Sequence, residues 1–151
     1  MTDNSTVPSP VPTPAAVNWP TFALATAAGL GAAVAGAALW AVVTVLTNYE
    51  IGIMAVAVGF MVGRGVIFVA KSGNFTYGVL GAVLSLLGCL LGNLLSAVGF
   101  AAPVMGVSYL ELLTHLDLNL AGMLMKETFG AMDLLFYAIG IYEGFRFASR
   151  R

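Results

Sequence analysis

The chain contains two long stretches without a single charged residue, one from Phe22 to Thr47 and one from Tyr77 to Ala102. A helix needs about 20 apolar residues to cross a hydrocarbon core about 30 Å thick, so each stretch is long enough for a membrane span. Charged residues make up only 9% of the chain, against about 25% in soluble domains, which leaves too little charge for a water-facing surface. We therefore expect an all-α integral membrane protein.

Two further apolar segments extend this interpretation to about four spans. The segment Ile51–Ala70 carries only Arg64, and a shorter segment, Ala131–Phe147, keeps Asp133 and Glu143. Both approach the length of a span, so the sequence predicts a polytopic bundle of about four transmembrane helices. The first two would form a tight hairpin.

The amino-terminal residues differ in composition from the rest. Residues 1–20 hold five of the six prolines, together with Ser, Thr and Asn. Such a segment has little to bury, so we expect a disordered, Pro-rich cytoplasmic tail, followed by one transmembrane domain over residues 21–151. Because the first basic residue is Arg64, the basic region of a signal peptide is missing, and we expect no cleavage.

Between the third and fourth expected spans, the segment Val107–Thr128 is amphipathic. Its apolar members follow the spacing of a single helical face, and its polar members fall away from that face. An interfacial or re-entrant helix fits this pattern, and so does a helix packed on the end of the bundle without lipid contact. The apolar set is Tyr109, Leu112, Leu113, Leu116 and Leu120, and the polar set is Glu111, Thr114, His115 and Asn119.

The basic residues predict the orientation. With four spans, five cations fall on the side of the two termini and one falls on the other side. Under the positive-inside rule this bias places both termini in the cytoplasm, and we expect a bacterial cytoplasmic (inner) membrane. The five are Arg64, Lys71, Arg146, Arg150 and Arg151, and the sixth is Lys126.

Small residues recur at the spacing used for close helix–helix contact. Such stripes let helix backbones approach where lipid supplies no hydrophobic drive. We expect the contacts within one bundle or between copies, so the predicted partners are lipid and either self-association or another membrane protein. Three GxxxG pairs are Gly59 with Gly63, Gly88 with Gly92, and Gly140 with Gly144. The first span repeats Ala25, Gly29, Ala33, Ala37 and Ala41.

Four ionisable residues are candidate functional positions, because a charge inside a span is costly. For each, a structural role competes with a functional one. Arg64 could reach the headgroups as a topology anchor, and Glu143 could pair with Arg146 on the same helix. Asp133 could point into the bundle or lie at its outer interface, and Glu50 falls in the first hairpin turn.

Nothing in the sequence forms a catalytic, cofactor or metal constellation, so we expect a non-enzyme without cofactors. His115 is the single histidine, and its i, i+2 spacing to Asp117 places the two side chains far apart around a helix. The single cysteine, Cys89, lies in an apolar run and suits packing. The six basic residues form no patch, which disfavours nucleic acid as a partner.

Three motifs resemble those of a group of small uncharacterised bacterial four-span membrane proteins. They are Thr47-Asn48-Tyr49-Glu50-Ile51-Gly52, Leu86-Leu87-Gly88-Cys89-Leu90-Leu91-Gly92-Asn93 and Ile141-Tyr142-Glu143-Gly144. The group has Gly before Tyr-Glu-Ile-Gly where this chain has Asn48, and either residue suits a turn. The resemblance implies a bacterial source and four spans, draws attention to Glu50 and Glu143, and carries no activity.

Two functions remain as hypotheses. The first is a non-enzymatic subunit, assembly factor or scaffold that acts through helix–helix contacts. The second is a small oligomeric transporter or channel, in which the four ionisable candidates line a polar path. The arrangement of those side chains distinguishes the two, and we expect them to be scattered.

Overall fold

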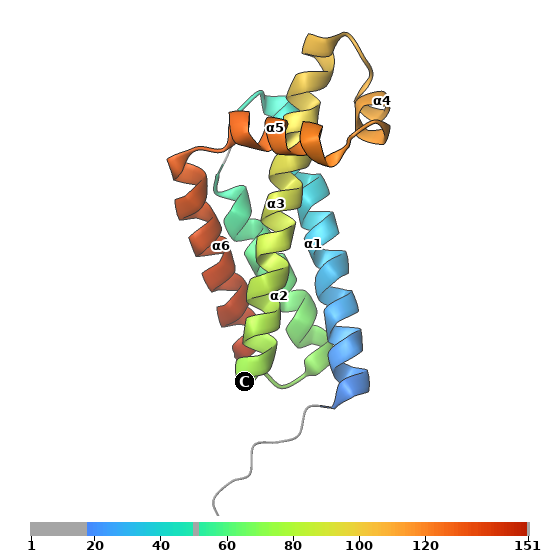
Figure 1. Cartoon of the computed structure of the whole chain (residues 1–151). Coiled ribbons are helices and arrows are strands. Elements are labelled where there is room, and N and C mark those ends of the chain that lie inside the picture. Colours follow the sequence, from blue (N-terminus) through green and yellow to red (C-terminus); the bar gives the residue numbers. More distant parts are fainter. Residues whose placement is uncertain (1–17, 50–51, 151) are drawn as a thin grey trace, which may run out of the picture.

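The computed structural model describes residues 18–49 and 52–150 and is all-helical over these ranges, with six helices and no strand (Figure 1). This agrees with the expected all-α class. The helices are α1 (Trp19–Thr47), α2 (Met54–Ala70), α3 (Phe75–Met105), α4 (Tyr109–Thr114), α5 (Leu118–Thr128) and α6 (Ala131–Ser149).

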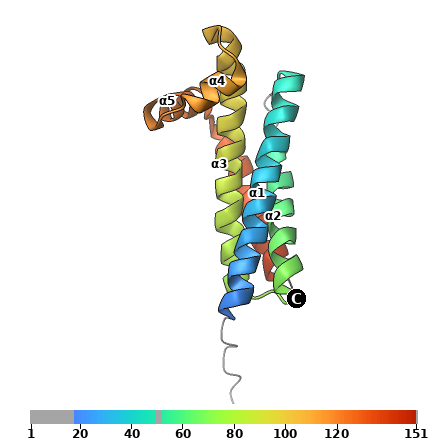
Figure 2. The same cartoon turned by 90° about the vertical axis from the view of Figure 1, so that its right-hand side faces the viewer.

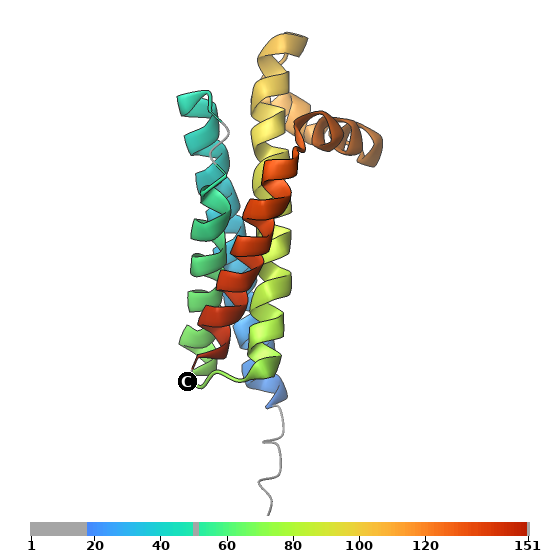
Figure 3. The same ribbon diagram turned by 90° about the vertical axis from the view of Figure 1, so that its left-hand side faces the viewer.

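Helices α1, α2, α3 and α6 form a four-helix bundle, whereas α4 and α5 contact α3 alone among the helices. The first residue of α1 and the last residue of α6 lie at the same end (Figure 1). Helix α5 lies across the bundle axis and projects to one side near the opposite end (Figures 2 and 3). Helices α2 and α6 run side by side in the same direction, both towards the end with the termini.

Two of the four bundle helices, α1 and α3, are long and apolar enough to cross a membrane by length and composition. At 1.5 Å per residue they measure about 43 and 46 Å. Helix α2 is apolar but has 17 residues, and α6 has 19 residues and carries Asp133, Glu143 and Arg146.

Helix α3 corrects one expected boundary. The uncharged stretch that predicts the third span runs to Ala102, but the helix continues to Met105 with Pro103 inside its last turn. A proline there removes one backbone donor without breaking the turns before it. Gly106 ends the helix instead, at φ 71°, while the Val107 N–H donates to the Ala102 carbonyl at 3.1 Å.

The expected single amphipathic helix is also wrong, because the segment divides into α4 and α5. The Asp117 carboxylate accepts a hydrogen bond from the Leu120 N–H at 2.7 Å and thereby starts a new helix. Side chains of the expected apolar face nevertheless pack together on α3, around buried Leu112, Val98 and Ala102.

Candidate functional site

The closest helix contact joins the GxxxG pairs of α2 and α6. A Cβ atom on Gly59 would overlap the Gly140 carbonyl oxygen, and one on Gly140 would lie 2.6 Å from the Ala55 carbonyl oxygen. One turn further on, a Cβ on Gly63 would lie 3.0 Å from the Gly144 carbonyl oxygen. The two backbones therefore touch along two turns, which only glycine permits.

Helix α3 meets the same contact through Gly81 and Ser85. A Cβ on Gly144 would lie 2.7 Å from the Gly81 carbonyl oxygen and would overlap the Ser85 hydroxyl. Three helices therefore meet at Gly144. Neither Gly81 nor Ser85 was among the sequence-predicted positions, although Gly81 lies seven residues before Gly88, on a similar side of the helix.

The α3 pair faces α1 and, at Gly88, also α2. A Cβ on Gly88 would lie 2.7 Å from Cγ1 of Val58 and 3.2 Å from the Ala33 Cβ, and one on Gly92 would lie 3.0 Å from Cε3 of Trp40. All six glycines thus lie at contacts inside the chain. The expected stripe of α1 is buried in full: Ala25, Gly29, Ala33, Ala37 and Ala41.

A polar contact between α3 and α6 was not predicted from the sequence. The Asn93 Nδ2 donates to the Tyr137 hydroxyl at 3.0 Å, and that hydroxyl donates to the Cys89 carbonyl at 3.4 Å. Both side chains are buried, and Trp40 packs edge-on against Tyr137 with ring centroids 6.4 Å apart. The available signal was Asn93 itself, the single amide side chain in the uncharged stretch of α3.

Buried hydroxyls in the bundle bond mainly to their own helices. Ser85 donates to the Gly81 carbonyl at 2.7 Å, and Ser96 donates to the Gly92 carbonyl at 2.8 Å. Thr44 is fully buried, and its Oγ1 has no hydrogen-bond partner within the described part of the chain. The bundle interior therefore combines glycine contacts with a few neutral hydrogen bonds.

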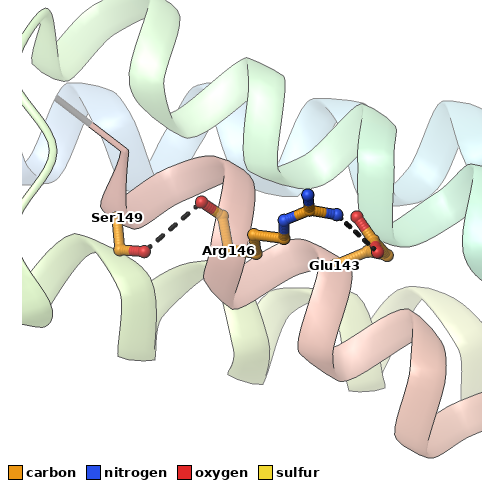
Figure 4. A network of polar contacts seen from close by, with 3 residues as sticks. All are labelled: Glu143, Arg146 and Ser149. Carbon is orange, nitrogen blue, oxygen red and sulfur yellow. Dashed lines mark hydrogen bonds and ion pairs between the residues drawn. The ribbon is translucent and has the colours of Figure 1, made fainter.

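Glu143 and Arg146 form the local ion pair that their spacing predicted (Figure 4). The Arg146 guanidinium lies 3.3 Å from Glu143 Oε1, and the Ser149 hydroxyl donates to the Arg146 carbonyl on the same helix. The Glu143 side chain is 16% exposed, because it lies in a groove between α2 and α6 beside Phe60 and Phe147. Its charge is therefore balanced within α6.

The other ionisable candidates lie elsewhere. The half-buried Asp133 accepts a hydrogen bond from the Gly130 N–H at 2.7 Å, so it caps the first turn of α6. Arg64 is exposed on α2 and forms no ion pair with the described residues. Glu50 lies outside the described residues. The three described candidates therefore do not converge on one site.

No cluster of three or more His, Cys, Asp or Glu residues that could hold a metal ion occurs in the described ranges. His115 is exposed, and its Nδ1 lies 2.9 Å from the carbonyl oxygen of Glu111, one turn earlier. Cys89 is buried as a free thiol. These residues contribute to helix geometry and packing.

The chain matches no known protein family, no curated protein and no solved structure.

We predict that Gly59→Ala lowers stability by about 1–3 kcal/mol, because the added methyl would push α6 away at its closest contact. Gly122→Ala is the matched control, since a Cβ on this α5 glycine would meet nothing within 4 Å. The control should be neutral or gain up to about 1 kcal/mol from helix propensity. Unfolding in one mild detergent measures both, and equal stability of the two variants would contradict the contact.

A second prediction concerns the bond between Asn93 and Tyr137. Tyr137→Phe should cost about 0.6–1.7 kcal/mol, the range for hydrogen bonds between helices in membranes. Tyr142→Phe removes the same hydroxyl from a residue that is 59% exposed, so it should cost nothing measurable. Comparing the two melting temperatures tests the bond, and an unchanged Tyr137→Phe protein would exclude a stabilising role.

For the ion pair, Glu143→Gln and Arg146→Gln should each cost only about 0.2–0.5 kcal/mol, as local helical pairs do. The two losses should also match, because each variant breaks the same contact. Melting temperatures in the same detergent provide the measurement. A large loss in Glu143→Gln alone would show that Glu143 serves another partner and would favour the transporter hypothesis.

Proposed function

We propose that the chain is a four-span membrane protein that acts through helix–helix contacts, as a small subunit, assembly factor or scaffold. The observation that carries this proposal is the division between the inside and the outside of the bundle. Small residues line the closest contacts between the helices, and large apolar side chains cover much of the outside, which suits a lipid environment. On α1 the exposed large apolar side chains are Trp19, Leu24, Leu30, Val34, Leu39, Val42 and Leu46.

The two shorter bundle helices support four spans. At 1.5 Å per residue, α2 and α6 measure about 25 and 28 Å, close to the hydrocarbon thickness of about 30 Å. Their charged side chains Arg64 and Arg146 are exposed and long enough to extend towards the headgroups. Helix α2 packs against α1, α3 and α6, and α6 packs against α2 and α3. Neighbouring helices therefore shield part of the length of each shorter helix.

The charges support cytoplasmic termini in a bacterial inner membrane. Lys71 and Arg150 lie at the end of the bundle where α1 begins and α6 ends. The opposite end has one cation, Lys126, among the described residues. Acidic residues gather at that opposite end, on α4, α5 and the start of α6: Glu111, Asp117, Glu127 and Asp133.

An outward stripe on α1 offers a surface for a partner helix. The GxxxG glycines are already used inside the chain, but α1 also exposes Ala23, Ala27, Gly31 and Ala35 at four-residue spacing. A Cβ on Gly31 would meet nothing within 4 Å, so the position is open to another helix. A second copy or another membrane protein could approach closely there.

The transporter alternative draws less support from the described candidates. Asp133 caps a helix at one end, Glu143 pairs within its own helix, and Arg64 lies on the outer surface. A polar path through one bundle would require these groups to face each other. Only a second copy beside the groove of Glu143 could complete such a path.

The orientation can be tested with a reporter that is active only in the periplasm. Fused after Arg151, it should be silent, because that end carries the cations that stay in the cytoplasm. Inserted after Gly122, in the exposed α5, it should be active. The opposite pattern would overturn the assignment of the termini, and activity at both sites would show that α6 does not cross the membrane and would contradict four spans.

The contact hypothesis predicts that Gly31→Leu weakens self-association or capture of a partner by at least about tenfold, because a branched side chain holds helices apart. Folding should be unaffected, since the position is open. Gly122→Leu, at another open glycine, is the control and should change nothing. Light scattering in mild detergent and co-purification from membranes give the measurement. A wild-type protein that is monomeric in detergent and lipid, with no partner, would remove the support for this function.

A further inference from the structure

A cavity of about 420 Å³ lies between the last turns of α1, the end of α3 and the start of α4. This volume falls within the usual range of small-molecule pockets, about 300–1,000 Å³. Among its lining residues are Val42, Val45, Leu46, Gly99, Ala102 and Tyr109.

The chemistry of the lining admits only an apolar ligand. It contains no charged side chain, and its single polar side chain is Tyr109. The Tyr109 hydroxyl donates to the Leu95 carbonyl at 3.3 Å, so this group is already engaged by α3. Burial raises the pKa of the Tyr109 phenol above its usual value of 10.0, which keeps the hydroxyl protonated as a donor at neutral pH.

The rim of the cavity is continuous with the outer surface of α1. Val42 and Leu46 line the cavity and are 54% and 77% exposed, so the cavity opens sideways towards the surface that we propose faces lipid. The α1 lining residues, Ala41 to Leu46, lie about 33 to 40 Å beyond Trp19 along the helix, which places the cavity at and just beyond the far edge of the hydrocarbon layer.

The volume of the cavity suits a hydrocarbon chain better than a partner helix. A helix at least about 10 Å wide occupies about 80 Å³ per Å of length, so this volume would hold only about one turn of a partner helix. A flexible hydrocarbon chain can enter through the side opening and follow the lining. We propose that the cavity binds one acyl chain of a phospholipid from the leaflet opposite the termini. This inference rests on the membrane-embedded bundle of the proposed function, and not on its partner.

Trp40 provides a reporter, because it adjoins Ala41 of the lining and is only 4% exposed. In a Trp19→Phe background it is the single tryptophan. The protein in mild detergent is titrated with phosphatidylglycerol that carries dibrominated acyl chains, whose bromines quench nearby tryptophan. We expect saturable quenching of Trp40.

Three variants at exposed positions of α1 test where the chain binds. Val42→Phe should weaken half-saturation by at least about tenfold, because the added ring fills part of the cavity and replaces packing contacts with the chain. Leu39→Phe adds a ring to the same helix at a residue that does not line the cavity, and should match the parent. Leu46→Phe, at the other exposed position of the rim, repeats the test.

Linear quenching that is equal in the parent and the variants would overturn the site. Saturation by free dibrominated stearate but not by the phospholipid would also overturn the proposed ligand. A different result would indicate that a second copy of the chain fills the cavity. In that case quenching would not saturate, and the Val42→Phe protein would lose its oligomeric state. Partition of the protein into the aqueous phase of a detergent phase separation would instead refute membrane embedding, and with it both proposals. A monomeric protein that still shows saturable quenching would contradict only the proposed partner.

Discussion

The direct contact of backbones at Gly59, Gly140 and Gly144 determines how the bundle is assembled. In the lipid environment that we propose, burying apolar side chains between helices gains little over exposing them to acyl chains, so close packing has to hold the helices together. Gly144 shows this most clearly, because the backbone of α6 meets both α2 and the Gly81–Ser85 turn of α3 there. A side chain at this junction would separate three helices at once. The parallel course of α2 and α6 follows from the order of the helices, because α3 returns the chain to the end at which α2 began.

The sequence predicted the features that depend on spacing along one helix. The α1 stripe from Ala25 to Ala41 and the ion pair between Glu143 and Arg146 need only the helical repeat. The bond between Asn93 and Tyr137 could not be predicted, because these residues lie 44 positions apart and meet only after α6 has packed on α3. The division of α4 from α5 was missed for the opposite reason: the local cap at Asp117 overrides the longer apolar periodicity.

Several charged and polar residues of the described chain bond within their own helices. Asp133 bonds to a backbone N–H of its own helix start, and Glu143 pairs with a residue one turn away. The His115 ring lies against its own backbone. Because each of these groups forms its hydrogen bond or ion pair within its own helix, the free-energy cost of its desolvation stays low. The same groups do not face one another across a site. The interior contact between α3 and α6 is made instead by neutral groups, the Asn93 amide and the Tyr137 hydroxyl.

Helix α1 combines two surfaces that do not compete for space. Its inward face carries the buried stripe, while its outward face carries Gly31 and its small neighbours in the half nearer the termini. The rim of the apolar cavity, at Val42 and Leu46, lies in the other half. Val42 follows Ala35, the last member of the outward stripe, by seven residues, which corresponds to about 10 Å along the helix, or one helix diameter. A helix crossing at Gly31 would therefore leave the cavity open, so a bound acyl chain and a partner helix could occupy α1 together.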